Sequence, residues 1–365
     1  MNRSPLRRAS AVAVVALVVI CVPGASPASA QRAWRIVPNP SLPGGTLSGV
    51  TSISDRDVWA VGWSGGALAE HWAGSAWTVV PTAPLGAPST FAAVDGAASD
   101  DVWAVGSWEN PAASPDEWDN LAEHWDGSSW TQIPFPSIAT GHSCTFNRID
   151  AVSAVSATDA WAAGSYDFCG SNGGGFAAHW DGTAWTMVNT APAYTDVLDG
   201  AAFVRPSLGW LVGARFDDDA GHDEPMVVRW DGTSWRPTLL SDGDGVLTSV
   251  VALSSRDAWA VGGIGRDRPF IVHWNGHRWR RVRPHAGPLG ALAGVTARGP
   301  RDVTAVGATL NGHTLVLHWD GVSWSRESSP NGTPPSRLLG VTTSPTSRTW
   351  AVGQDSAGPL IERRR

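Results

Sequence analysis

Asp57-Val58-Trp59-Ala60-Val61-Gly62 begins a stretch that continues through Glu70-His71-Trp72-Ala73-Gly74 and ends at Trp77. Both halves of this stretch recur along the chain. Copies of the first half close on a glycine, and most copies of the second half read His-Trp-Asp-Gly before a further tryptophan. The closing glycines are Gly62, Gly106, Gly164, Gly213, Gly262, Gly307 and Gly353. A repeat of about 40–50 residues is typical of propellers and solenoids.

Each repeat predicts four short strands. The first is a run of small and β-branched residues such as 292–296, and the second is the Trp-Ala-Val-Gly run. The third is apolar and ends in His-Trp, as in 270–274, and the fourth starts at the last tryptophan. Asp-Gly between the third and fourth strands marks a hairpin, because glycine adopts a positive φ without steric strain. Short strands separated by turns indicate an all-β fold.

The two ends of the chain complement each other. The last repeat stops after its third strand, at 360–363, and the segment 33–38 matches the fourth strand at 76–81. We therefore predict a seven-bladed β-propeller of four-stranded antiparallel blades, in which the N-terminal strand completes the last blade and closes the ring. Radial stacking buries both faces of each sheet. The repeated tryptophans, each burying roughly 200 Å², would fill the space between blades.

These repeats resemble known families. Trp-Ala-Val-Gly followed by Asp-Gly and a tryptophan resembles the Gly-Trp-Ala-Val-Gly and Asp-Gly-Gly-x-x-Trp pattern of the photosystem II assembly-factor type of propeller. The turn also resembles the Asp-box (BNR) repeat of sialidases, although Asp-Gly-x-x-Trp is one residue shorter here. Kelch repeats are a looser match, through Gly262-Gly263 and the late tryptophan. The resemblance implies a β-propeller and no particular activity.

Residues 1–30 are predicted to be a signal peptide, and residues 31–365 a single propeller domain. Arginines precede an apolar run at 11–22, and Ala28-Ser29-Ala30 has the small residues of a cleavage site. An uncleaved anchor is the alternative. The net charge is −7, which argues against binding to nucleic acid or an anionic membrane. We expect a secreted monomer without a membrane anchor, and an exported protein allows a disulfide between Cys144 and Cys169.

The longest insertions fall between the second and third strands of the first four repeats, so they gather on one face, which we call the b–c face. Insertions of this kind often form the binding face of a repeat protein. Aromatic residues outside the repeat pattern lie in these predicted loops, and they are candidates for stacking on sugar rings or for covering the blade tops. They are Trp63, Trp108, Trp118, Tyr166 and Phe168.

Two sets of polar residues are candidates for chemistry. The acidic run that contains Asp217, Asp219, Asp223 and Glu224 could bind Ca²⁺ through oxygen ligands, although its spacing matches no established motif; we expect no other cofactor. Carboxylates on or near the first strands could act as a catalytic pair for glycoside hydrolysis, with an arginine nearby. These candidates are Asp95, Asp150, Asp199 and Arg148.

The recurring histidines and aspartates have a structural interpretation. A closed ring holds equivalent residues of different blades apart, so the histidines before the third-strand tryptophan are not expected to gather into a site. The aspartates before the second strand are expected to bond turn backbone. We therefore predict a binding protein for an extracellular glycan or protein partner. A propeller hydrolase or lyase, and a structural assembly scaffold, are the alternatives.

Overall fold

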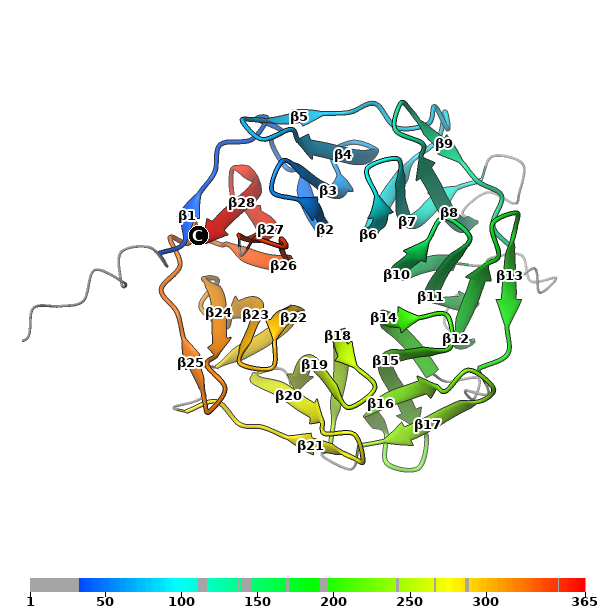
Figure 1. Ribbon diagram of the computed structural model, residues 1–365, viewed down its shortest axis with the longest axis vertical. Helices are drawn as coiled ribbons and strands as arrows, with labels where there is room; N and C mark the ends of the chain where they lie inside the picture. Colours follow the sequence, from blue (N-terminus) through cyan, green and yellow to red (C-terminus); the bar gives the residue numbers. More distant parts are fainter. Residues whose placement is uncertain are drawn as a thin grey trace, which may run out of the picture.

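The computed structural model describes residues 33–110, 117–136, 138, 146–168, 171–190, 196–240, 243–265, 267–285, 289–346 and 348–364. Within these residues β-strands are the only regular secondary structure, and they are arranged radially about a common centre (Figure 1). The described residues contain no helix of a length and hydrophobicity that could cross a membrane. The predicted signal peptide, Cys144 and Cys169 lie outside the described residues.

The strands fall into four kinds by their position in the repeat. The first strands lie nearest the centre: β2 (Thr46–Ser54), β6 (Ser89–Ala98), β10 (Phe146–Ser156), β14 (Asp196–Arg205), β18 (Gly245–Ser254), β22 (Gly290–Gly299) and β26 (Arg337–Thr343). The second strands follow: β3 (Asp57–Trp63), β7 (Asp101–Glu109), β11 (Asp159–Phe168), β15 (Leu208–Asp217), β19 (Asp257–Ile264), β23 (Asp302–Thr309) and β27 (Thr349–Asp355).

The third and fourth strands complete each sheet toward the rim. The third strands are β4 (Ala67–Trp72), β8 (Trp118–Trp125), β12 (Ser171–Trp180), β16 (His222–Trp230), β20 (Arg268–Trp274), β24 (Thr314–Trp319) and β28 (Gly358–Arg364). The fourth strands are β1 (Arg35–Ile36), β5 (Trp77–Val79), β9 (Trp130–Gln132), β13 (Trp185–Val188), β17 (Trp235–Leu239), β21 (Trp279–Arg281) and β25 (Trp324–Arg326).

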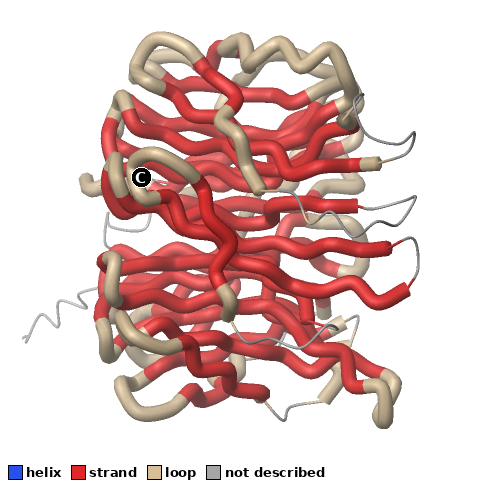
Figure 2. The backbone as a smooth tube through the Cα atoms, turned by 90° about the vertical axis from the view of Figure 1, so that its right-hand side faces the viewer, coloured by secondary structure: helices blue, strands red, loops and turns tan. Residues whose placement is uncertain are grey.

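The sheets are antiparallel and mostly four-stranded, which confirms the predicted all-β fold. One eight-stranded sheet joins the β6–β9 and β10–β13 groups through a single parallel pair, Phe146 with Trp118. In another sheet β1, from the start of the chain, pairs with β28 from its end, as the sequence predicts. Viewed from the side, the strands of neighbouring sheets lie in successive layers (Figure 2).

The repeated glycine has a steric explanation. Every first strand carries a register shift opposite the second strand, so that one extra residue bulges out of the ladder. The backbone next to this bulge approaches the second strand closely. A Cβ placed on Gly62 would lie 2.1 Å from the carbonyl oxygen of Thr46, which only glycine avoids. The Trp-Ala-Val-Gly pattern therefore encodes a bulge on the strand beside it.

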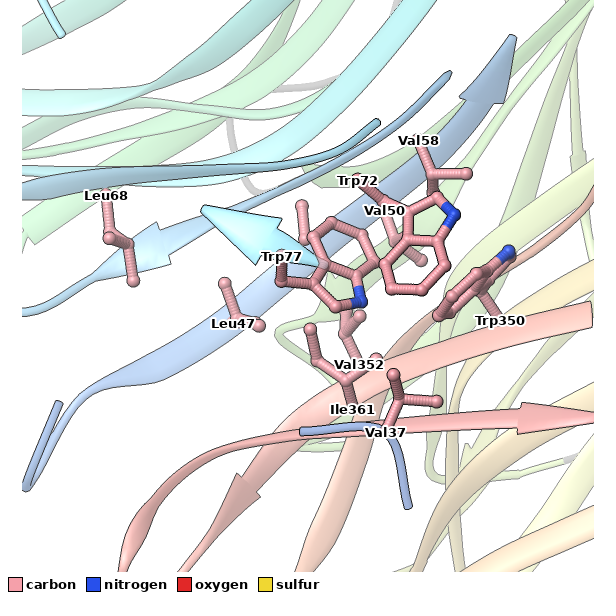
Figure 3. Close-up of a cluster of buried hydrophobic side chains, with 11 residues drawn as sticks. Val37, Leu47, Val50, Val58, Leu68, Trp72, Trp77, Trp350, Val352 and Ile361 are labelled. Atoms are coloured by element: carbon pink, nitrogen blue, oxygen red, sulfur yellow. The ribbon is translucent and has the colours of Figure 1, made fainter. Parts of the chain in front are cut away.

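Tryptophans fill the space between neighbouring sheets. Trp350 of β27 lies 5.1 Å from the ring of Trp72 and 5.3 Å, edge to face, from that of Trp77 in the next sheet (Figure 3). Trp59 makes the same contacts with Trp125 and Trp130. At about 25 cal/mol per Å² of buried apolar surface, each such ring contributes several kcal/mol. The predicted role of the tryptophans is confirmed.

The junction between the β22–β25 sheet and the β26–β28 sheet differs from the others. Thr304 occupies the place of the second-strand tryptophan, and Arg364 occupies that of the last third-strand tryptophan. Glu327 accepts hydrogen bonds there from Trp34 Nε1 at 2.7 Å and from Arg364 Nη1 at 2.7 Å. Arg364 also donates to the Thr304 hydroxyl at 2.9 Å. One carboxylate thus holds residues from both ends of the chain.

The histidine column is structural, as predicted, but its partners differ from our expectation. The aspartate that begins the second strand hydrogen-bonds to the histidine that precedes the third-strand tryptophan, for example Asp57 to His71 at 2.8 Å. The same pair forms in four further repeats. The expectation that these aspartates bond turn backbone was wrong, because the histidine lies across the hairpin and its ring stacks on the second-strand tryptophan, as His71 does on Trp59.

Candidate functional site

The bulged residues of the first strands point into the centre of the molecule. They line a cavity to which each first strand contributes, and this cavity opens into a larger one at the b–c face. A bulge re-aims one side chain without ending the strand, so each sheet presents one residue there. The bulged residues are Ser48, Ala92, Asp150, Asp199, Thr248, Ala293 and Leu339.

Two adjacent bulge positions carry aspartate, and they form the polar centre of the site. Arg148, two residues before Asp150 on β10, donates from Nε to the Asp150 carboxylate at 3.0 Å and to the Ser165 hydroxyl at 3.2 Å. Ser165 in turn donates to Asp150 at 3.2 Å. Arg148 Nη2 lies 4.0 Å from the Asp199 carboxylate of the neighbouring strand β14. One guanidinium therefore lies between two carboxylates from different sheets.

Burial and the neighbouring charges shift the pKa values of Arg148, Asp150 and Asp199. Burial raises the pKa of Asp199 to about 7, and repulsion from Asp150 adds to the effect. Burial also raises the pKa of Asp150, although the attraction of Arg148 opposes the shift. Burial disfavours the charge of Arg148, but Asp150 outweighs this and raises the guanidinium pKa. Asp199 is therefore partly protonated at neutral pH, which reduces the repulsion between the two carboxyl groups.

The cavity at the channel mouth is large enough for a small ligand. Its volume is about 530 Å³, within the range of roughly 300–1,000 Å³ that is usual for ligand pockets. Besides the charged cluster, hydroxyl groups contribute to its wall, from Ser48, Thr90, Ser107 and Thr248. We name this cavity, with Arg148, Asp150 and Asp199, the channel-mouth site.

Asp95 does not belong to this site. Its carboxylate accepts hydrogen bonds from the Thr51 hydroxyl at 3.0 Å and from the Ala154 backbone N–H at 2.9 Å. These partners lie on β2 and β10, on either side of its own strand β6. Burial raises the pKa of Asp95 to about 6. The structure does not bring Asp95 together with the other catalytic candidates: it lies one position beyond the channel-lining residues and instead ties three first strands together.

The aromatic candidates lie on the b–c face, mostly within strands rather than loops. Trp108 is the penultimate residue of β7 and Trp118 begins β8, because the hairpin extends further than the repeat pattern suggests. Trp108 and Tyr166 both pack against buried hydrophobic clusters, which fits a covering role. Trp63, at the end of β3, is 42% exposed. The backbone of Phe168 ends β11, but its side chain lies outside the described residues.

The acidic run near Asp217 forms a hairpin turn rather than a gathered set of ligands. The Asp217 carboxylate accepts hydrogen bonds from the backbone N–H groups of Asp219 and Ala220, and these lower its pKa. Glu224 forms an ion pair with Arg215 across the hairpin. Asp223 is next to Glu224 on the same strand, so its side chain points to the opposite face. Within the described residues no cluster of acidic, His or Cys side chains could hold a metal ion, so the Ca²⁺ candidate is not supported.

The sequence analysis did not identify several residues that contribute to the site or to the core. Ser165, which completes the channel-mouth cluster, looks like an ordinary strand residue, and Phe146 is 41% exposed at the b–c face. Three fully buried glutamates on third strands have a pKa raised to about 7 by burial. These glutamates are Glu70, Glu123 and Glu362. Aligning the repeats would have identified them, because each is a charged residue at a third-strand position that is apolar in the other repeats.

Comparison with known proteins places the fold among β-propellers. No protein-family model matches the chain, and no curated protein does. A solved structure described as YCF48 bound to a D1 peptide matches with a TM-score of 0.59 and 18% identity, covering 91% of this chain and 94% of that chain. The WD40 propeller domain of Doa1 matches with a TM-score of 0.61 and 11% identity, covering 90% and 96%. A six-bladed fucose-binding lectin of Aleuria aurantia has a TM-score of 0.51 and 15% identity, covering 80% and 98%.

Proposed function

We propose that this chain is a secreted, seven-bladed β-propeller, closed by β1, that binds an extracellular glycan at the channel-mouth site. The observation that carries the proposal is the cluster of Arg148, Asp150 and Asp199 at the bulge positions of adjacent first strands. The pairing of β1 with β28 supports the closed ring. Contacts of β2 with both β6 and β26 support it as well.

The chemistry of the site favours a neutral, hydroxyl-rich ligand. Carboxylates accept hydrogen bonds from pairs of hydroxyl groups, and a guanidinium donates to ring or hydroxyl oxygens. Because Arg148 already lies beside the Asp150 and Asp199 carboxylates, these charges offset one another and a strongly charged ligand gains little there. Sugars meet both conditions. Exposed aromatic side chains on the same face, Trp63 and Phe146, add surfaces on which a sugar ring can stack.

The neighbouring propellers support binding as a use of this fold. The lectin is described by its fucose recognition, and YCF48 was solved with a peptide bound. At these identities the likeness extends to the fold alone. A protein partner is therefore the alternative ligand for the same face.

A glycan array probed with the purified protein tests the proposal. We expect binding that Asp150→Asn and Asp199→Asn each weaken about tenfold, since each removes a charge-assisted hydrogen bond. Asp218→Asn, the same change at an exposed turn, is the matched control and should bind as the wild type does. If no glycan binds, or if the control loses as much affinity as the site variants, the channel-mouth glycan site is wrong.

Glycoside hydrolysis is the second candidate, because Asp199 has the pKa of a general acid and lies near a second carboxylate. It predicts reducing-end release from oligosaccharides, with a rate that depends on a group titrating near pH 7. Both aspartate variants should abolish the release. Binding without product formation would favour the lectin-like function.

A further inference from the structure

A second groove lies away from the channel mouth and is lined by residues of β16, β17, β20 and β21. Figure 1 shows the fourth strands β17 and β21 on the outer rim. Two adjoining cavities of about 340 and 450 Å³ make up this groove, and Thr238, Trp274, His277 and Trp279 line both of them. Trp279 is only half-buried, and so is its equivalent Trp235 on β17, whereas the equivalent Trp77, Trp130, Trp185 and Trp324 are at most 5% exposed. The two fourth strands beside the groove therefore expose more of this ring than those four strands do.

The charged side chains of the groove are cationic. Arg229 and Arg236 line one cavity, and Arg278 and Arg281 line the other. No carboxylate lines either cavity in the part of the chain that the structure describes. Asp231, just outside, lies 2.9 Å from Arg236 Nε, but the Arg236 side chain is 68% exposed. This local excess of positive charge contrasts with the net charge of −7 of the whole chain.

Arg229 lies in the groove without the carboxylate partner that most repeats supply at this position. In five other repeats this position is a histidine whose partner is the aspartate that begins the second strand. Here the second strand begins with Leu208, so the repeat supplies no carboxylate. The guanidinium stacks over Trp210 and Trp274, 5.9 and 5.7 Å from their ring centroids. Its buried Nε has no hydrogen-bond partner among the described residues.

We propose that this rim groove binds an acidic sugar, with a uronate carboxylate held by Arg229 and Arg236 and the sugar ring placed against Trp274 or Trp279. Guanidinium groups bind carboxylates through paired hydrogen bonds. Flat indole faces suit the apolar face of a pyranose ring. A long phosphate polymer is disfavoured, because the negative charge of the whole protein repels it beyond the groove. This site is independent of the channel-mouth site.

Calorimetric titration with trigalacturonate tests the proposal, with its methyl ester as the uncharged ligand of the same length. We expect the wild type to bind the acid at least about tenfold more tightly than the ester. Arg229→His, which installs the residue that the other sheets use, and Arg236→Glu should each weaken binding about tenfold or more. Asp150→Asn should leave it unchanged, which separates this groove from the channel-mouth site.

Arg35→Glu is the matched control. Arg35, the first residue of β1, directly follows Trp34, just as Arg236 of β17 directly follows Trp235. Retained affinity in this variant supports a built groove. An equal loss in Arg35→Glu and Arg236→Glu would show only long-range electrostatics and overturn the proposal. Absence of trigalacturonate binding by the wild type would also overturn it, as would equally tight binding of inorganic triphosphate. Thermal melting of each variant confirms that the compared proteins are folded.

Discussion

The carboxylate that joins both ends of the chain should contribute measurably to stability. Glu327 accepts hydrogen bonds from Trp34 Nε1 at 2.7 Å and from Arg364 Nη1 at 2.7 and 2.8 Å. Only 19% of the Glu327 side chain and 8% of the Arg364 side chain are exposed. Glu327→Gln preserves the shape but removes the charge, so it leaves a buried guanidinium without its closest counter-ion.

The expected loss in free energy of unfolding is about 2–4 kcal/mol. A hydrogen bond to a charged group contributes about 1.5–3 kcal/mol, and removing one partner of a buried ion pair costs about 3–5 kcal/mol. Asp302, 3.7 Å from Arg364 Nη2, takes over part of the counter-charge and reduces the loss. Since domains are stable by about 5–15 kcal/mol, the effect is a large share of the total.

Urea unfolding followed by tryptophan fluorescence measures this loss. Arg326→Gln, at the exposed neighbouring residue, is the control and should change stability by less than about 0.5 kcal/mol. Arg364→Met combined with Glu327→Gln should destabilise less than the sum of the two single variants, since the second change removes the unpaired charge. A Glu327→Gln variant as stable as the control, or strictly additive effects, would refute the role we assign to this junction.

Two further predictions rest on the fold, and a third rests on the sequence of the N-terminal segment. The free energy of unfolding should fall as pH rises from about 5 to 8, because burial raises the pKa of Glu70, Glu123 and Glu362, and a pKa raised in the folded state favours folding only while the group is protonated. Replacing each of these residues by glutamine should reduce this pH dependence, measured by urea unfolding, by roughly 1–3 kcal/mol for each. Gly62→Ala should destabilise by at least about 2 kcal/mol in the same assay, since its Cβ would meet the backbone at 2.1 Å, whereas Gly66→Ala, with its nearest contact at 4.0 Å, should not. Mass spectrometry of exported protein should give Gln31 as the first residue, and an intact Met1 would contradict the predicted cleavage.

Much of the candidate site was visible in the sequence, but its grouping was not. Asp150, Asp199 and Arg148 were identified as polar residues on or near first strands, and the structure brings them together. Asp95 had the same apparent signal and serves another purpose, because it lies three residues past the bulge rather than on it. The repeat pattern shows which strand a residue is on. It does not show which way a bulged side chain points.

The sequence by itself determined the all-β fold and its four-stranded sheets, because turn glycines, tryptophans and strand length act locally and recur with the repeat. It also indicated that β1 pairs with β28, since the missing fourth strand appears at the other end of the chain. Only the tertiary structure decided which side chains meet. A one-residue bulge reverses the direction of a side chain, and Arg148 reaches Asp199 only because their two sheets pack side by side. The groove near Arg229 likewise depends on the packing of two sheets, which no pattern within a single repeat specifies.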